Sequence, residues 1–129
     1  MEHLANMMIV TNEITVKNNN IQDGVFTLSP RFTRNTGMKA ENTGYTELIA
    51  EIVNTPDAPF PLDIRVSLTG IFEMNNIPLE QHDSFLKITA VQVLFPYVRN
   101  IISTVTASAL VPPIVLPIID VKTLFQQEE

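Results

Sequence analysis

The chain has 129 residues, 45% of them hydrophobic, which suits a single domain over residues 1–129 with a modest core. Its net charge is −6, with 14 acidic and 8 basic residues and no basic cluster, which argues against nucleic-acid binding because phosphate recognition needs a concentrated basic surface. The absence of Cys rules out disulfides and thiolate chemistry, and the first residues lack the pattern of a secretory signal, so we expect a cytoplasmic protein.

Strands are predicted within residues 7–74. The first covers Ile9–Val16 and ends at the turn-forming run Asn18–Asn20. The second alternates apolar and polar residues over Phe26–Thr33, with Pro30 at a bulge or an edge position. Gly37–Gly44 is predicted to be a polar connection to the next strand.

The third and fourth predicted strands are separated by the turn-rich segment 54–59 and have the clearest patterns. The third covers Tyr45–Val53. In the fourth, every second residue from Phe60 to Phe72 is apolar or Gly, whereas Asp63 and Arg65 belong to the alternate set. A period of two predicts a sheet with one buried and one wetter face, and short loops between consecutive strands predict an antiparallel meander.

Helices and a crossover loop are predicted within residues 78–127. Apolar residues recur at steps of three and four, at Ile88, Val91, Phe95, Val98, Ile102 and Val105, and Leu94 and Ile101 widen the stripe. Pro96 lies within this stripe, so it either starts the main helix or kinks it. Asp120 is a predicted N-cap for a last helix that contains Leu124 and Phe125.

The stretch from Ile101 to Ile119 contains no charged residue and has the length of a membrane span. Its prolines at 112, 113 and 117 forbid one continuous helix, and lipid cannot satisfy the backbone groups that they leave free. We therefore expect no membrane insertion, and instead a surface that a partner covers or that binds other chains.

No pattern predicts an enzyme, a metal or a cofactor. His82 and Asp83 are adjacent on a predicted helix start and point in different directions, so we expect a solvated pair there. Glu47 and Glu51 share the outer face of the third strand, where a cross-strand partner such as Arg65 is favoured over acid–base work. The glycines are scattered and form no phosphate-binding loop.

The segment Leu94–Ser103, which reads Leu-Phe-Pro-Tyr-Val-Arg-Asn-Ile-Ile-Ser, resembles the helix motif of the SecB export chaperones. Gly70-Ile71-Phe72 resembles the end of that family's fourth strand. Val111-Pro112, Leu116 and Leu124-Phe125 are similar in spacing to its crossover loop and final helix. The resemblance covers residues 44–125, whereas the first two strands match only in pattern.

The resemblance implies an α+β fold, a four-stranded antiparallel sheet packed by two C-terminal helices that a Pro-rich crossover loop joins. It also implies a homotetramer built as a dimer of dimers. The implied activity is that of a chaperone that holds unfolded or pre-secretory polypeptides in apolar grooves without ATP or metal, for protein export. A SecB-like protein dedicated to one partner, such as a component of a toxin–antitoxin system, is the alternative, because both roles need an apolar groove.

The resemblance places the client-binding groove between the sheet and the crossover loop, at Phe26, Leu28, Phe32, Phe60, Leu62, Leu110, Val111, Ile114 and Leu116. For the strand residues among these, ordinary core packing is the alternative. The helical stripe is wider than one small sheet must cover, so we expect an oligomer interface at Val91, Phe95, Val98, Ile102 and Val105.

The outer sheet face, with Glu47, Glu51, Asp63 and Arg65, corresponds to the surface on which SecB proteins dock the SecA translocation motor. SecB proteins have an acidic residue where this chain has Arg65, and acidic residues near the positions of Asn18 and Gln22. The family's C-terminal tail is also not matched. We therefore expect weak or no docking of SecA.

Overall fold

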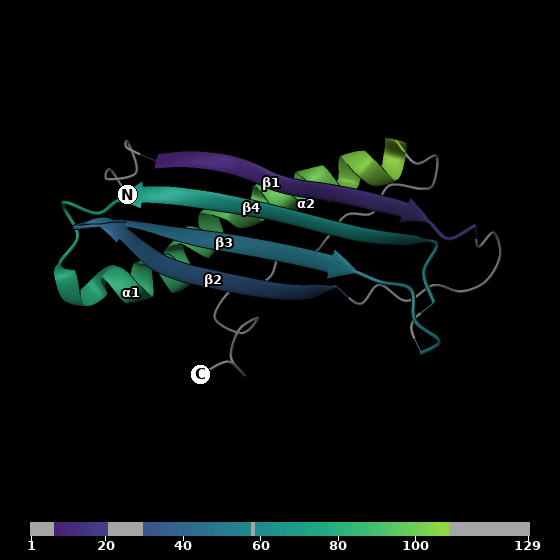
Figure 1. Ribbon diagram of the computed structural model, residues 1–129, viewed down its shortest axis with the longest axis horizontal. Coiled ribbons are helices and arrows are strands. Elements are labelled where there is room, and N and C mark those ends of the chain that lie inside the picture. The colour runs from purple at the N-terminus through teal and green to yellow at the C-terminus, as the bar shows by residue number, and fades with distance from the viewer. Residues whose placement is uncertain (1–6, 21–29, 58, 109–129) are drawn as a thin grey trace.

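The computed structural model describes residues 7–20, 30–57 and 59–108, which form a four-stranded antiparallel sheet with one long helical segment behind it (Figure 1). The strands are β1 (Met7–Asn18), β2 (Arg31–Ala40), β3 (Thr43–Ile52) and β4 (Leu62–Glu73). The helical segment consists of η2 (Leu79–Gln81), α1 (His82–Ser84), η3 (Phe85–Thr89) and α2 (Ala90–Ser108). The predicted α+β class is therefore confirmed. The predicted crossover loop and last helix, with Asp120, lie outside the described residues.

The strand order β1-β4-β3-β2 corrects the predicted meander at one point. β2, β3 and β4 follow one another as predicted, but β1 pairs with β4, from Met7 opposite Phe72 to Asn18 opposite Leu62. The result is a Greek-key order. Because β4 is the most apolar strand, a central position with partners on both sides buries it best, and β1 takes its free side.

The β2–β3 hairpin also differs from prediction, because β2 continues to Ala40 and includes much of the expected polar connection. Glu41 and Asn42 form the turn, and Asn42 has a φ of 63°. Asn tolerates this left-handed conformation better than most residues. Gly37 lies opposite Tyr45, and a Cβ at Gly37 would lie 2.7 Å from Cε2 of the Tyr45 ring. The glycine therefore leaves room for this ring.

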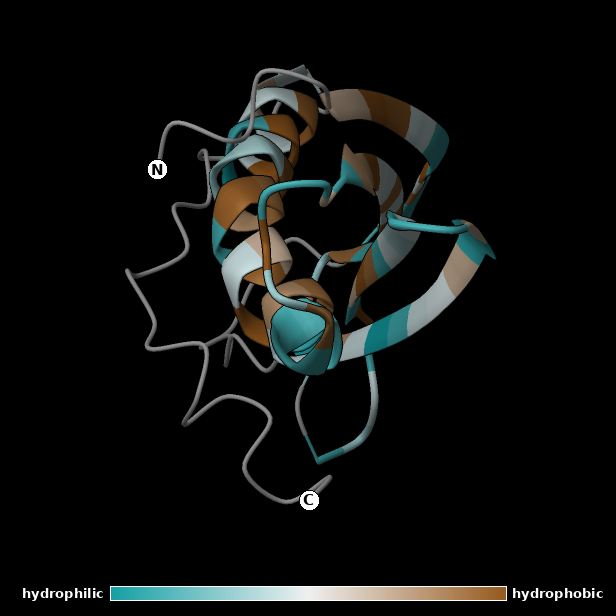
Figure 2. Cartoon of the chain, turned by 90° about the vertical axis from the view of Figure 1, so that its left-hand side faces the viewer, coloured by the Kyte–Doolittle hydropathy of each residue, from teal (hydrophilic) through white to brown (hydrophobic). Residues whose placement is uncertain are grey.

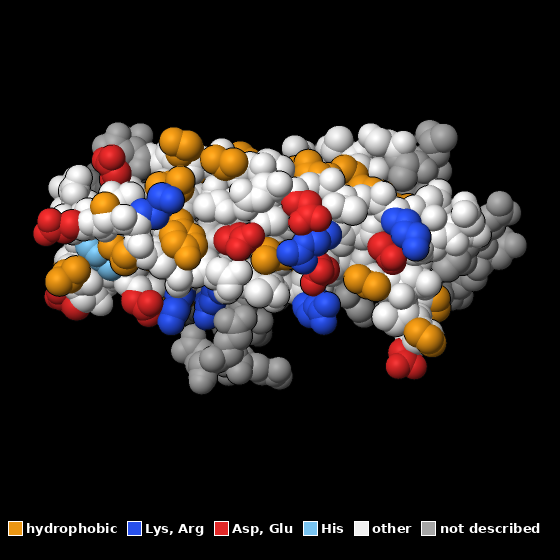
Figure 3. Space-filling model, in the orientation of Figure 1, with side chains coloured by type: hydrophobic (Ala, Val, Ile, Leu, Met, Phe, Trp, Pro, Cys, Tyr) orange, Lys and Arg blue, Asp and Glu red, His pale blue; other side chains and the backbone are white. Residues whose placement is uncertain are grey.

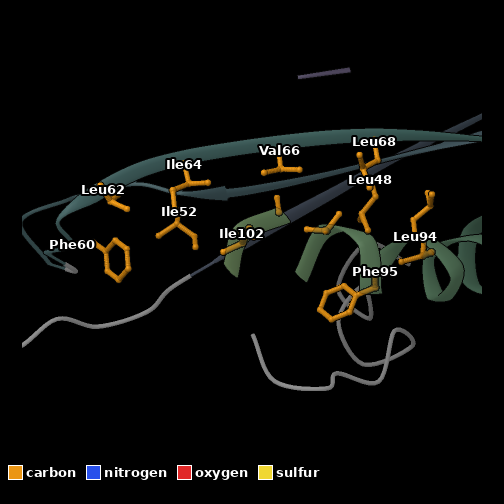
Figure 4. Packing of buried hydrophobic residues seen from close by; sticks show 13 residues of the cluster. Leu48, Ile52, Phe60, Leu62, Ile64, Val66, Leu68, Leu94, Phe95 and Ile102 are labelled. Atoms are coloured by element: carbon orange, nitrogen blue, oxygen red, sulfur yellow. The ribbon is translucent and has the colours of Figure 1, made fainter. Parts of the chain in front are cut away.

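The main core forms between α2 and the inner faces of β3 and β4, as Figure 2 shows from one end of the sheet and Figure 4 from close by. It contains Leu48, Ala50, Ile52, Phe60, Leu62, Ile64, Val66, Leu68, Val91, Leu94, Phe95, Val98 and Ile102. The predicted inner face of the fourth strand is thus confirmed. Leu79–Ser108 also has the length and composition of a membrane-crossing helix, but its apolar side packs against the sheet.

The helical segment contains a π turn, η3, in which the Ala90 N–H donates to the carbonyl of Phe85, five residues earlier. The buried residues His82, Leu86, Ala90 and Leu94 follow one another at steps of four through this turn. One face of the helical segment therefore stays buried on both sides of the π turn. Pro96 lies inside α2 and does not start the helix.

Candidate functional site

Three of the nine predicted groove residues lie in the described part of the chain, and two of them are core. Phe60 is 6% exposed and Leu62 is fully buried, because both belong to the main core cluster, Phe60 from the loop before β4 and Leu62 from the first position of that strand. Phe32, on edge strand β2, is only partly buried, and its ring packs 5.5 Å from that of Phe95 at an angle of 50°. Phe32 is thus the described groove residue that remains accessible.

The other predicted groove residues, Phe26, Leu28, Leu110, Val111, Ile114 and Leu116, lie outside the described residues. Phe60 and Leu62 instead belong to the core cluster against which Phe32 packs. The alternation along β4 identified a buried face correctly, but alternation does not tell whether a client or the chain's own helix covers that face.

The predicted oligomer interface is also core within one protomer. Val91, Val98 and Ile102 are fully buried, Phe95 is 6% exposed, and Val105 packs partly buried against the same cluster. The stripe is wide because α2 crosses β3 and β4 and covers both. These side chains pack against the chain's own sheet, so a contact between subunits needs another surface.

Strand β1 carries exposed apolar residues that sequence reasoning did not select. Met8 (58% exposed) and Val10 (41%) lie on the outer face, and Ile14 (47%) and Val16 (37%) lie on the helix side. Among the described strands, β1 lies at the edge of the sheet and pairs with β4 alone. An apolar edge of this length is a site for association with another chain. The sequence signal was the run Met7–Val10, which is apolar at every position rather than at alternate ones.

Arg65 is the centre of an ion-pair network on the outer face, where acidic and basic side chains alternate in Figure 3. Its Nε lies 2.9 Å from Oε1 of Glu13, and its Nη1 lies 2.7 Å from Oε2 of Glu51. Arg31 also reaches Glu51, at 3.3 Å. The predicted pairing of Arg65 with a third-strand glutamate is thus confirmed for Glu51.

These contacts shift the pKa values of Glu13 and Arg65. Hydrogen bonds from the Thr15 hydroxyl and from Arg65 hold the pKa of Glu13 below its ordinary value. Hydrogen bonds to Glu13 and Glu51 raise the pKa of Arg65. The two arginines and two glutamates neutralise each other, so this part of the face is not an acidic surface.

Glu47 belongs to a second network that contains no cation. Its carboxylate accepts hydrogen bonds from Ser67 Oγ at 2.6 Å and from Asn35 Nδ2 at 3.1 Å. Asn12, at the irregularity in β1 between Thr11 and Glu13, donates to Ser67 and Thr69. Side chains of all four strands are thus joined across the outer face. No sequence pattern pointed to Asn12, because the β-bulge moves it out of the alternation.

Asp63, which was predicted on a partner-facing surface, has a local structural role in this chain. Its Oδ1 accepts hydrogen bonds from the Asn54 backbone N–H at 2.8 Å and from Asn19 Nδ2 at 3.1 Å. These two donors, the backbone one first, hold the pKa of Asp63 below its ordinary value. Asp63 therefore joins the end of β1 to the loop after β3.

His82 is buried, at 5% exposed, and not solvated as predicted. Its Nε2 lies 2.9 Å from the carbonyl oxygen of Ile77, while Asp83 points away to an i,i+4 ion pair with Lys87 at 3.3 Å. In residues 7–20, 30–57 and 59–108, no three His, Asp or Glu side chains gather into a metal-binding group.

Comparison with known proteins connects this geometry to a family. The family model of the preprotein translocase subunit SecB matches residues 9–129. A protein-export protein SecB from Dinoroseobacter shibae is 40% identical over 65 residues, which cover 50% of this chain and 38% of that protein. Another, from Dechloromonas aromatica, is 30% identical over 95 residues, which cover 72% of this chain and 62% of that protein.

The chain thus spans about two fifths of the length of the first curated relatives that it matches. The fold has a solved counterpart in the Mycobacterium tuberculosis Rv1957 SecB-like chaperone, determined in complex with a peptide from the HigA1 antitoxin. That structure aligns with a TM-score of 0.74 at 13% identity, over 89% of this chain and 91% of the other, so the likeness concerns the fold. Because the family model matches nearly the whole sequence, the chain belongs to the SecB family.

Proposed function

We propose that this protein is a non-enzymatic, ATP-independent chaperone that holds unfolded polypeptides in the cytoplasm. The observation that carries the proposal is the match of residues 9–129 to the SecB family model, together with the SecB-like arrangement of sheet and helix. The accessible aromatic side chain of Phe32 at the sheet edge supports it. Export is one use of this activity, because the curated SecB relatives are named for it.

The client groove of this proposal begins at Phe32 and continues through residues outside the described part of the chain, Phe26, Leu28, Leu110, Val111, Ile114 and Leu116. Phe60 and Leu62 belong to the core cluster against which Phe32 packs. Apolar contact without charged residues suits clients of varied sequence, because apolar burial is non-directional. A client is thus recognised as an unfolded chain rather than by a motif.

Suppression of client aggregation tests this proposal, by light scattering with several unrelated unfolded proteins and without nucleotide. Val111→Asp and Leu116→Asp should weaken protection while the circular dichroism spectrum stays unchanged. Thr104→Asp, at an exposed position of α2, is the matched control and should leave protection intact. Protection of no client would contradict the proposal, and unfolding of both groove variants would show that those residues belong to the core.

A role for one dedicated partner is the second candidate. The Rv1957 SecB-like chaperone was solved with a peptide of an antitoxin, so this fold accommodates a specific polypeptide. The outer face of this chain favours the same reading, because the ion pairs around Arg65 neutralise the surface on which SecA docking would depend. Protection of a single cognate protein in the aggregation assay would select this candidate.

The proposal includes a homo-oligomer, a tetramer built as a dimer of dimers. The buried stripe of α2 cannot form its interface, but the apolar edge of β1 with Met8, Val10, Ile14 and Val16 can. Pairing of this edge with a second copy would satisfy its free backbone groups and bury these side chains. Substitution of Ile14 and Val16 by Lys should then produce smaller species.

A further inference from the structure

The outer face of the sheet has a charged half, with the ion pairs of Arg65, and an apolar half toward the β2–β3 turn. In the apolar half, residues that lie opposite one another form a row across all four strands, namely Met8, Ile71, Tyr45 and Gly37. The three side chains of this row, together with Val10 on β1, make what we name the outer apolar patch. Hydrophobic side chains gather accordingly on the left of Figure 3.

The outer apolar patch is accessible in the described part of the chain. Met8 is 58% exposed and Val10 is 41% exposed, while Ile71 and Tyr45 are half-buried. The Tyr45 ring lies against Gly37, where a Cβ would be 2.8 Å from the Tyr45 hydroxyl oxygen, so the ring extends the patch toward β2. None of the four side chains belongs to either core cluster. The patch is therefore not needed to hold α2 on the sheet.

Two carboxylates flank this patch. Along the β3–β4 ladder, Glu47 lies two residues beyond the row of Ile71 and Tyr45 on one side, and Glu73 lies two residues beyond it on the other. Two residues of a strand span about 7 Å. Among the described residues neither carboxylate forms an ion pair, whereas the glutamates beside Arg65 are paired with arginines. The apolar half of the face thus combines apolar side chains with carboxylates that await a cation on both sides.

We propose that the outer apolar patch binds an extended segment of another protein with the pattern basic–x–apolar–x–basic. In an extended chain, alternate side chains point to the same side at intervals of about 7 Å. A segment that runs along the strands therefore places its apolar side chain over Ile71 and Tyr45, and its basic side chains at Glu47 and Glu73. Exposed ion pairs contribute little affinity, so the apolar contact supplies most of the binding and the charges supply selectivity.

This site is separate from the surfaces described above. Phe32, where the proposed client groove begins, lies on the opposite face of the sheet and packs against the main core. Pairing of the β1 edge with a second copy would leave Ile71 and Tyr45 free, because they lie on β4 and β3. The inference therefore goes beyond the proposed holding of unfolded chains and needs neither the groove nor the oligomer.

Titration of the isotope-labelled full chain with the capped peptide Gly-Lys-Ser-Leu-Ser-Lys-Gly, followed by two-dimensional NMR, tests the position of the site. The shuffled peptide Gly-Leu-Lys-Lys-Ser-Ser-Gly has the same composition without the spacing and is the control. The first peptide should shift amide signals at residues 8–10, 45–47 and 69–73 and should bind about fivefold more tightly than the shuffled one. Equal affinity for the two peptides, or shifts confined to the surroundings of Phe32, would overturn the proposal.

Substitutions test the apolar contact. Ile71→Thr keeps the branched shape and should weaken peptide binding about fourfold, the factor that corresponds to one buried methylene group. Val53→Thr, at a 45% exposed position outside the patch, is the matched control and should leave the affinity unchanged. Circular dichroism of both variants checks the fold. Unchanged affinity of a folded Ile71→Thr variant would contradict the proposed contact.

A change of sign tests the charges. Lys39 is exposed at the irregular end of β2, beside the patch, and repels the basic side chains of the peptide. Glu73→Gln should therefore weaken binding about twofold, and Lys39→Gln should strengthen it about twofold. Lys17→Gln is the control, because Lys17 lies opposite Asp63, about 27 Å along β4 from Ile71 and beyond the screening length of about 8 Å. Weaker binding by Lys39→Gln, or equal strengthening by Lys17→Gln, would refute the assignment.

Discussion

Phe95 and Phe32 distinguish the core from the client surface, and their substitution gives different expected results. Phe95 is 6% exposed in the main core, and its ring packs on the partly buried Phe32. Phe95→Ala should therefore destabilise the chain by about 3–5 kcal/mol, the usual cost of a large cavity, out of a total of about 5–15 kcal/mol. Phe32→Ala should cost less, roughly 2 kcal/mol, because its ring is only partly buried.

Urea unfolding followed by circular dichroism measures both losses, and the double variant measures how the two rings are coupled. An aromatic pair of this geometry contributes about 0.5–1.5 kcal/mol beyond burial, so the two losses should not add. Phe95→Leu keeps most of the volume and serves as the milder control, with an expected loss below about 1.5 kcal/mol.

The effect on client binding should be larger for substitution of Phe32 than for substitution of Phe95, the reverse of their effects on stability. At a temperature where all variants are folded, Phe32→Ala should lower client affinity, whereas Phe95→Leu should leave it unchanged. If Phe95→Ala were as stable as the unmodified chain, the placement of α2 on the sheet would be wrong. If Phe32→Ala left client affinity unchanged, Phe32 would not belong to the groove.

Three further predictions concern the outer face, the loops and the β1 edge. Arg65→Glu should strengthen any binding of SecA from the same organism in calorimetry, since it adds a carboxylate beside Glu13 and Glu51; tight binding by the unmodified chain, insensitive to this change, would place docking elsewhere. Asp63→Asn should lower stability in urea titrations at neutral pH, and the difference should disappear as the pH falls. The pKa of Asp63 is lower in the folded chain than in the unfolded chain. The contribution of Asp63 to stability is therefore present above the unfolded pKa of about 4 and is lost as the pH falls through the folded pKa. A stability difference that persists in acid would refute this assignment. Light scattering during gel filtration should give a mass well above 14.4 kDa for the unmodified chain and a smaller one after Ile14→Lys, and a monomer in both cases would remove the proposed edge pairing.

The sequence predicted those features that depend on local periodicity. The buried face of β4 and the buried stripe of α2 follow directly from periods of two and of three to four residues. The pairing of β1 with β4 could not be predicted in the same way, because Met7 and Phe72 are far apart in the chain and no local pattern selects the partner. The end of β2 was misplaced because Arg34 and Thr36 stand on its inner face, where the alternation calls for apolar residues.

The candidate site was predicted less well than the fold. Periodicity identifies a buried residue but not what buries it, so Phe60 and Leu62 were assigned to a groove although α2 and the sheet enclose them. The π turn at Phe85–Thr89 was also not predicted, because the buried residues His82, Leu86 and Ala90 keep the regular spacing of a helix through it. The pairing of Arg65 with Glu51 was predicted because both positions were assigned to one outer face.

Binding of one labelled client in its unfolded and folded forms tests the central claim most directly. Fluorescence anisotropy, recorded without nucleotide and with a client that can be held unfolded by a destabilising substitution, compares the two forms under identical conditions. The account predicts saturable binding of the unfolded form and at least tenfold weaker binding of the folded form, because an apolar groove needs exposed apolar side chains. Equal affinity for both forms, or no binding of the unfolded form, would contradict the proposal that this member of the SecB family is a chaperone.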